Sequence, residues 1–125
     1  MLINRILYHS LFLPYVKIYK MNIKLAAIPS KEIMPGYHGK LIHTKNMSLA
    51  FWEVEKDAVV PEHSHVNEQV MQVLEGKFEF TLNGVTKIYE SGDLVVIGSF
   101  LPHSGKALTD CKLMDVFSPT REEYM

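Results

Sequence analysis

Two histidines separated by one residue, His63 and His65, are the first side chains in this sequence whose types and spacing could do chemistry. On an extended strand, residues i and i+2 point to the same side, so both imidazoles would lie on one face. Two imidazoles are costly to bury together unless something satisfies their nitrogens, and a metal ion does so. An isolated pair is more often simply exposed in a loop, so a metal site needs further ligands.

Further candidate ligands follow the pair. Glu68 and Gln69 come shortly after His65, and His103 closes a second motif, GDLVVIGSFLPH. If EQVMQVL is a strand, Gln69 shares the face of Met71, which is the expected interior, and Glu68 points to the opposite side. The opposite face is also partly apolar, so alternation favours Gln69 over Glu68 without deciding between them.

The C-terminal segment CKLMDVFSPTREEYM holds a second group of candidate residues. On a strand, Asp115 would share a face with the apolar side chains of Leu113 and Phe117. An unpaired carboxylate is expensive to bury, and its pKa rises there. Asp115 could instead be half exposed at a strand end, or be paired with Arg121 after a turn at Ser118-Pro119.

The elements that must position these residues are predicted to be strands. Short apolar runs alternate with turn signals, and no long segment after Met21 has a helical period. Asn83-Gly84 predicts a tight hairpin, and Pro61 and Pro102 are expected at strand ends or in loops. The turn spacing indicates an all-β sandwich or small barrel. The runs are MSLAFWEV, QVMQVLEG, KFEFTLNG, VTKIYESG, DLVVIGS and CKLMDVFS.

The two motifs together resemble those of the cupin superfamily. The first is HSHVNEQVMQVLEG and the second is GDLVVIGSFLPH, with Gly98 standing where the family often has proline. The resemblance implies an all-β cupin jelly-roll (double-stranded β-helix) barrel. It also implies one divalent transition metal (Zn, Ni, Mn, Fe or Co), held by His63, His65, Gln69 and His103. These nitrogen and amide ligands suit such metals.

A narrower resemblance rests on DVFSPTRE, together with MSLAFWEVEKDAVVPEHSH and EQVMQVLEGKFEF. These segments are similar to those of the small cupins of pectin and alginate breakdown, which convert 4,5-unsaturated monouronates to linear ketouronates. The resemblance implies an isomerase-type enzyme with Asp115 and Arg121 as catalytic residues, and with Arg121 and Phe117 binding the substrate. An iron-dependent cupin dioxygenase and a non-catalytic sugar-binding cupin are the alternatives.

Size and composition limit the remaining choices. The chain has 125 residues, 47% hydrophobic and 22% charged, and a formal net charge of -1. These values are typical of one folded domain, and the absence of a basic block argues against nucleic acid as a partner. The single cysteine, Cys111, excludes an internal disulfide and suits a reducing compartment, so we expect a cytoplasmic protein. Cys111 itself is expected to be a small buried hydrophobe.

The expected domain is residues 21–125, preceded by an N-terminal extension, residues 1–20, that could reflect a misassigned start. A secreted leader and a structural arm are the alternatives for that segment, which is too short and interrupted to span a bilayer. The cupin resemblance also implies a homodimer that pairs through sheet edges, and edge pairing covers exposed ladder groups. His38 and His43 lie before the first motif, and either could approach the site.

Overall fold

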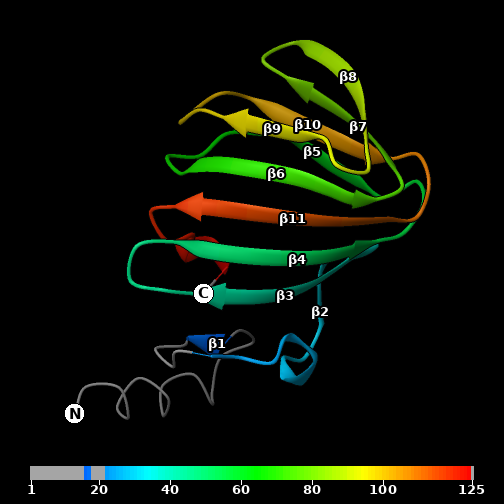
Figure 1. The fold of residues 1–125 in the computed structure, drawn as a ribbon. Coiled ribbons are helices and arrows are strands. Elements are labelled where there is room, and N and C mark those ends of the chain that lie inside the picture. The colour runs from blue at the N-terminus through cyan, green and yellow to red at the C-terminus, as the bar shows by residue number, and fades with distance from the viewer. Residues whose placement is uncertain (1–15, 18–21, 125) are drawn as a thin grey trace.

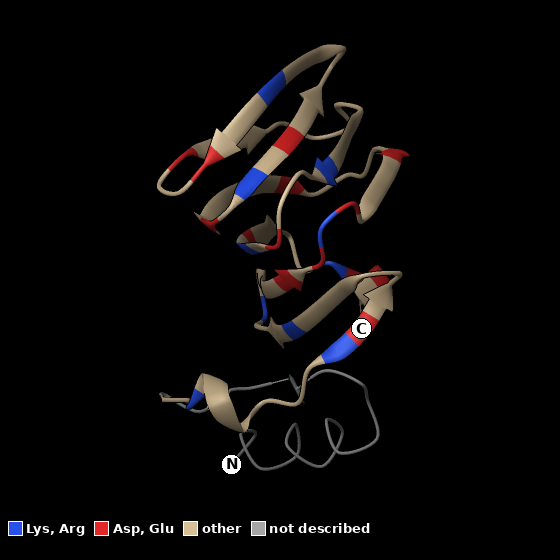
Figure 2. Cartoon of the chain, turned by 90° about the vertical axis from the view of Figure 1, so that its right-hand side faces the viewer, with Lys and Arg blue, Asp and Glu red and all other residues tan. Residues whose placement is uncertain are grey.

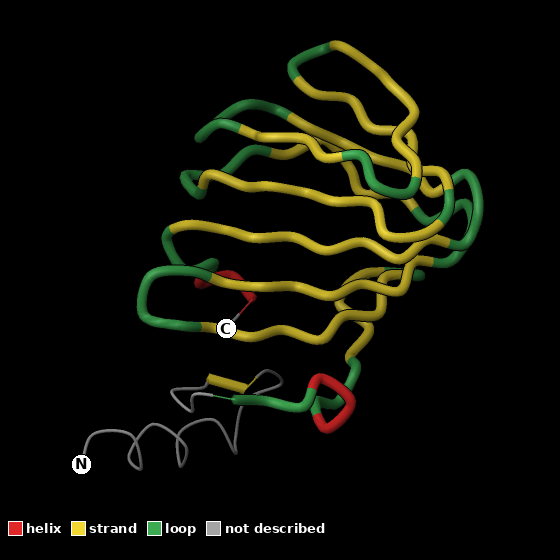
Figure 3. The backbone as a smooth tube through the Cα atoms, viewed as in Figure 1, coloured by secondary structure: helices red, strands yellow, loops and turns green. Residues whose placement is uncertain are grey.

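The computed structural model describes residues 16–17 and 22–124, and its strands form two sheets. Figure 3 shows that strands dominate and that the helices are short turns, η1 (Leu25–Ala27) and η2 (Glu122–Tyr124). The seven-stranded sheet contains β1 (Val16–Lys17), β2 (Lys31–Met34), β3 (Tyr37–His43), β4 (Ser48–Val54), β6 (Glu68–Glu75), β9 (Leu94–Ile97) and β11 (Cys111–Ser118). The four-stranded sheet contains β5 (Val59–His63), β7 (Lys77–Leu82), β8 (Val85–Glu90) and β10 (His103–Ala107).

The strand order confirms the predicted jelly roll. The larger sheet runs β1-β3-β4-β11-β6-β9, with β2 added on β3, and the smaller runs β5-β10-β7-β8. Every pair is antiparallel except β1 with β3. Strands distant in sequence therefore become neighbours, and β11 lies between β4 and β6 (Figure 1). No helix among the described residues is long and apolar enough to cross a membrane.

Alternation along β6 and β11 places the candidate residues inside. Gln69, Met71 and Val73 of β6 are buried, as are Asp115 and Phe117 of β11. The register pairs Phe117 with Gln69 and Asp115 with Met71, so the two candidate polar side chains lie one row apart. The prediction that Gln69 faces inward is confirmed, and Glu68 is exposed.

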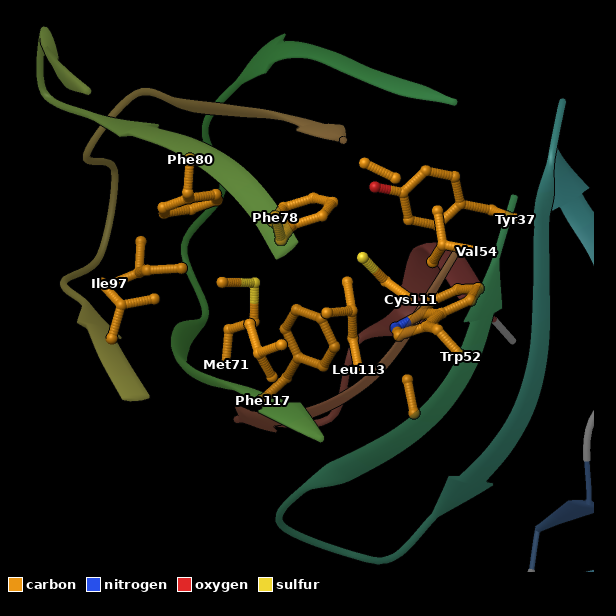
Figure 4. Close-up of a cluster of buried hydrophobic side chains, with 14 of the residues drawn as sticks. Tyr37, Trp52, Val54, Met71, Phe78, Phe80, Ile97, Cys111, Leu113 and Phe117 are labelled. Carbon is orange, nitrogen blue, oxygen red and sulfur yellow. The ribbon is translucent and has the colours of Figure 1, made fainter. Parts of the chain in front are cut away.

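The space between the sheets is filled mainly by aromatic and branched side chains. Figure 4 shows Phe78 and Phe80 of β7 facing Leu113 and Phe117 of β11, with the Trp52 indole beside them. Gly39 of β3 allows this packing, because a Cβ there would come within 2.4 Å of the Trp52 ring. The core therefore fixes the position of the indole.

The strands agree with the sequence prediction at one hairpin and differ from it at several other positions. Asn83 and Gly84 form the predicted hairpin, with φ values of 47° and 83°, and they connect β7 to β8. Pro61, expected at a strand end, instead lies within β5, where it is tolerated because β5 is an edge strand. Strands β1, β2, β3, β5 and β10 were not among the predicted apolar runs.

The expectation about residues 1–20 falls almost wholly outside the described residues. Within that segment only Val16–Lys17 are described, and they form β1 beside β3. Along the rest of the described chain, acidic and basic residues are interspersed rather than gathered in blocks (Figure 2). This distribution agrees with the formal net charge of -1.

Candidate metal centre

Three imidazoles converge at one end of the barrel. His63 ends β5 and His103 begins β10, and the two are paired in the sheet register. His65 lies in the loop that follows β5. The ring centroid of His63 lies 4.3 Å from that of His103 and 5.6 Å from that of His65. Possible metal-binding atoms of all three side chains lie within 4.8 Å of one another. The three side chains could therefore hold one metal ion.

The route by which His63 and His65 meet differs from the predicted one. The i, i+2 argument assumed one continuous strand, but β5 ends at His63. The His65 ring is instead fixed by the loop, where its Nδ1–H donates to the carbonyl oxygen of Asn67 at 2.9 Å. The predicted convergence is thus present, but a loop produces it.

Backbone carbonyls fix the same tautomer in all three rings. Besides the His65 bond, His63 Nδ1 donates to Pro61 O at 2.9 Å and His103 Nδ1 donates to Leu101 O at 2.8 Å. A carbonyl oxygen only accepts, so each Nδ1 carries hydrogen and each Nε2 presents a lone pair. The Nε2 atom of His103 is buried with no hydrogen-bond partner among the described residues. Metal-binding histidines usually donate their other ring N–H to a carbonyl or carboxylate oxygen in this way, which fixes the orientation of the ring.

Burial also favours the neutral form of two of these rings, as metal ligation requires. The pKa of His103 is lowered to about 4, chiefly by desolvation and also by the neighbouring imidazoles and the Arg121 guanidinium, while the bond to Leu101 raises it. Desolvation, followed by the Arg121 charge, lowers the pKa of His65 as well. The Nε2 lone pairs of His65 and His103 are therefore available near neutral pH.

Gln69 supplies an amide oxygen beside the imidazoles. Its Oε1 lies 3.1 Å from His65 Nε2, while its Nε2 donates to Asp115 Oδ1 at 2.9 Å. The His65 tautomer leaves two lone-pair atoms facing each other, a contact that a cation between them would relieve. His65 and Gln69 would therefore suit joint coordination of one divalent transition metal ion, through a neutral imidazole and an amide oxygen.

Asp115 is buried, but neither of the two arrangements considered from the sequence applies. It is not half exposed, and its carboxylate accepts hydrogen bonds from Gln69 and from Trp52 Nε1, each at 2.9 Å. Burial raises the pKa of Asp115 to about 6, while these two bonds and the Arg121 charge oppose the rise. Among the described residues no ion pair joins Asp115 to Arg121.

Arg121 brings a buried positive charge to the same end. Only 4% of the residue is exposed, and its guanidinium lies over the Phe117 and Tyr124 rings, 5.5 and 4.9 Å from their centroids. Its Nη1 is 2.8 Å from the carboxylate of Glu123, which is largely exposed. Phe117 in turn contacts the His65 ring. The charge is therefore linked to the candidate metal site through one aromatic ring.

Two positioning residues were missed from the sequence. Trp52 was interpreted chiefly as core, yet its indole holds Asp115. Asn67 joins two parts of the site, since its backbone oxygen accepts from His65 and its side chain donates to Pro119 O at 2.6 Å, close to Arg121. Alternation along residues 48–54 could have placed Trp52 inward, but no sequence signal identifies its partner.

The other histidines lie elsewhere. His38 points to the outside of the larger sheet, where its Nε2 lies 3.1 Å from Glu55. His43 is buried, and its Nδ1 is 2.7 Å from Ser48 Oγ, which also accepts from the Arg121 backbone N–H. Neither belongs to the three-histidine cluster. Cys111 is buried, as predicted, and desolvation raises its pKa, so it does not resemble a nucleophile.

The cavity beside the histidines is small. About 40 Å³ of free space remains between the sheets, bordered by His63, Gln69, Asp115 and Phe117 among others. That volume holds one or two water molecules but no sugar ring. A larger ligand would therefore have to reach the ring nitrogens from the end of the barrel.

Comparison with known proteins bears on the family and the fold of this chain. A sequence model of the cupin domain matches residues 50–117. KdgF from Halomonas sp. is similar in structure, with 26% identity, a TM-score of 0.80, and coverage of 85% of this chain and 99% of that protein. An RmlC-like cupin from Shewanella frigidimarina has 24% identity and a TM-score of 0.81, covering 85% and 96%.

A more distant similarity in fold is to oxalate decarboxylase from Bacillus subtilis. Identity is 17% and the TM-score 0.72, covering 82% of this chain and 30% of that one. No curated protein matches the sequence significantly.

Proposed function

Because this chain belongs to the cupin domain family, we propose that it is a metal-dependent enzyme that opens 4,5-unsaturated monouronates to linear ketouronates. The observation that carries the proposal is the buried pair of functional groups beside the three histidines, the Asp115 carboxylate and the Arg121 guanidinium. A carboxylate suits proton transfer and a guanidinium suits a uronate. The DVFSPTRE segment that supplies both resembles that of the uronate cupins, and the likeness to KdgF agrees in fold and length.

The proposed metal ligands are His63, His65 and His103 through Nε2, with Gln69 through Oε1. All four are neutral, so they suit a divalent ion of Mn, Fe, Co, Ni or Zn. Such an ion would supply Lewis acidity, polarising substrate oxygens and stabilising negative charge that develops on them.

Asp115 is the proposed proton-transfer group. In the substrate, the ring oxygen is attached to an alkene carbon, and the anomeric carbon carries a hydroxyl. Removal of the hydroxyl proton lets the anomeric carbon form a carbonyl as its bond to the ring oxygen breaks, leaving an enol. Transfer of a proton to the enol carbon then gives the ketone, so the product is an isomer of the substrate. A carboxyl group with a pKa of about 6 can accept and return a proton near neutral pH.

Gln69 and Trp52 would orient that carboxylate by donating to both of its oxygens. Arg121 would bind the uronate carboxylate with its forked donors, and its Nε has no hydrogen-bond partner among the described residues. Phe117, lying between Arg121 and His65, would form one wall of the sugar site. The small internal volume places the sugar at the barrel end, not deep between the sheets. Cytoplasmic action, on pectin- or alginate-derived sugars, is part of the proposal.

The test is an absorbance assay with metal-loaded protein and a 4,5-unsaturated galacturonate. Ring opening followed by proton transfer to the enol carbon removes the alkene conjugated to the carboxylate, so ultraviolet absorbance should fall faster than the spontaneous rate. Asp115→Asn should slow turnover about 10²- to 10⁴-fold, the usual contribution of general acid–base catalysis, while metal content stays unchanged. Glu53→Gln, which alters an exposed acid on the neighbouring strand, is the matched control and should retain full activity.

The outcomes separate the alternatives. Full activity in Asp115→Asn would remove Asp115 from the mechanism. Oxygen consumption during turnover would favour the dioxygenase, and binding of the uronate without turnover would favour the sugar-binding cupin.

A further inference from the structure

The loop that carries His65 is tied to the segment that carries Arg121. We call residues 64–67, between β5 and β6, the histidine loop, and residues 119–121, which follow β11, the arginine segment. The His65 ring donates from Nδ1 to the backbone oxygen of Asn67 at 2.9 Å. The side chain of Asn67 donates to Pro119 O at 2.6 Å and lies 3.4 Å from Thr120 O. One residue therefore contacts a proposed metal ligand with its backbone and the arginine segment with its side chain.

Burial makes the contact between Asn67 and the arginine segment hard to break. Asn67 is 4% exposed, and a buried amide that loses its acceptors without reaching water destabilises the protein. The ladder between β11 and β6 ends at the pair of Ser118 with Glu68. Beyond that pair, the Asn67 amide joins the arginine segment to the histidine loop. The loop and the segment should therefore move together.

The other side of the arginine segment is held by strand β4 and the loop before it. Thr120 Oγ1 donates to Thr44 O at 2.8 Å, and the backbone N–H of Arg121 donates to Ser48 Oγ at 2.7 Å. The backbone that carries the Arg121 side chain is thus fixed between these bonds and the Asn67 amide. A change in the histidine loop would reach the segment through Asn67.

A metal ion and its charge would act on the arginine segment in opposite directions. Ligation at His65 Nε2 would hold the ring at both nitrogens, because Nδ1 already donates to Asn67 O. That restraint would steady Asn67 and, through its side chain, the segment. Charge alone would loosen the segment, because Arg121 is positive and already disfavours a positive charge on His65 and His103. The sign of the metal's effect therefore distinguishes the hydrogen-bonded link from simple repulsion.

We propose that Asn67 is a positioning residue that couples the metal centre to Arg121, so that metal binding at the three histidines tightens the arginine segment. Coupling between two sites is reciprocal, so a fixed segment also favours the metal. One consequence rests on the proposed function: Arg121 is held most firmly for the uronate carboxylate when the metal that acts on the sugar is present. The coupling itself does not depend on the reaction catalysed.

The test measures amide hydrogen exchange by NMR in the full-length protein, freed of metal and then saturated with Zn²⁺, which has no redox chemistry. Exchange of a bonded amide reports how often its segment opens. The reporters are the N–H groups of Arg121, bonded to Ser48 Oγ, and Tyr124, bonded to Arg121 O. Rates are taken relative to Gly92, bonded to Val73 O, because a bound metal also stabilises the whole protein. In wild type, Zn²⁺ should slow both reporters by at least about 5-fold, the lower end of typical coupling.

Two variants of different size remove the link. Asn67→Ala has no amide, and Asn67→Ser is too short to reach Pro119 O. In both, slowing by Zn²⁺ should disappear or reverse, and the dissociation constant for Zn²⁺ should rise by at least about 5-fold because coupling is reciprocal. Thr120→Val is the matched control, since it removes a bond from the opposite side of the same segment. Its reporters should exchange faster in both states, yet Zn²⁺ should slow them as in wild type. Circular dichroism checks that each variant folds.

Two results would overturn the proposal. The first is a wild type in which Zn²⁺ leaves the two reporters unchanged or speeds their exchange. The second is an Asn67→Ala variant with the full effect of Zn²⁺, which would assign the coupling to the Phe117 ring between Arg121 and His65. No uronate is used in these measurements. A protein that shows the coupling but does not turn over the uronate would contradict the proposed function and leave this inference standing.

Discussion

The two faces of β6 and β11 each carry side chains that depart from the usual distribution of polarity. The inward side chains include Gln69 and Asp115, which are buried and joined by a hydrogen bond. The outward side chains include Val70, Met114 and Val116, which are apolar and only partly covered. An ordinary sheet with one solvated face would place these groups the other way round.

The difference between the two faces identifies residues whose presence is not explained by the stability of the fold alone. Buried polar groups must be desolvated, and they bring no stability over a well-packed apolar core unless every partner is in place. Here the partners are in place, through Trp52 and Gln69 on the Asp115 carboxylate. The polar groups of the inner face are therefore arranged as a connected set beside the three histidines.

The first prediction contrasts an inward with an outward histidine. His103→Ala removes one of three converging imidazoles, and His38→Ala removes one that pairs with Glu55 on the outside. Loss of a group that only hydrogen-bonds to a metal ligand costs roughly 10- to 100-fold in metal affinity, so loss of a ligand itself should cost at least about 100-fold. Metal content after dialysis, measured by mass spectrometry, checks this. Equal metal loss in both variants would contradict the assignment of the site to the inner cluster.

The second prediction contrasts adjacent residues of β4. Trp52→Phe keeps an aromatic ring in the core but removes the N–H that donates to Asp115. Asp115 would then be less well oriented, so kcat should fall about 10- to 150-fold, in line with ~1.5–3 kcal/mol for a hydrogen bond to a charged group. KM and metal content should stay close to wild type. Phe51→Leu, one residue earlier on the outer face, should leave kcat unchanged.

A purely structural role for Trp52 would give a different result. In that case the melting temperature would fall, but kcat per folded, metal-loaded protein would remain that of wild type.

The sequence could predict the elements whose signal is local. Turn residues and apolar alternation located β4, β6, β7, β8, β9 and β11, and Asn83-Gly84 formed the hairpin. The short edge strand β5 contains Pro61 and mixed polarity, so it gave no local signal. Strand β10, HSGKA, is held by its neighbours β5 and β7 rather than by its own composition.

The residues of the candidate site could be predicted from the sequence, but the hydrogen bonds that connect them could not. Spacing and family resemblance indicated His63, His65, Gln69 and His103, which the fold brings together with Asp115. The bond from Trp52 to Asp115 spans two strands far apart in sequence, and it depends on a register that no local pattern encodes. Their roles as ligands and catalytic groups stay predictions until metal and activity are measured.

The smallest predicted effect concerns an ion pair between a buried residue of the site, Arg121, and an exposed one, Glu123. Glu123 lies on the surface, yet its carboxylate is 2.8 Å from the Nη1 of buried Arg121. If Arg121 binds the uronate carboxylate, Glu123 competes for the same donors, and Glu123→Gln should lower KM. A pair with one exposed partner contributes ~0.2–1 kcal/mol, which predicts a decrease of about 2- to 5-fold at most, with kcat unchanged.

Control variants decide whether the change in KM comes from the Glu123 carboxylate itself. Glu122→Gln removes the same charge from a neighbouring position, so it should leave KM within experimental error of wild type, whereas Arg121→Lys should raise KM because it loses the forked donors. Added salt should shrink the difference between Glu123→Gln and wild type, because the exposed carboxylate is screened. A higher KM in Glu123→Gln would mean that Glu123 holds Arg121 in its binding orientation. The C-terminal turn would then belong to the binding site rather than compete with the substrate.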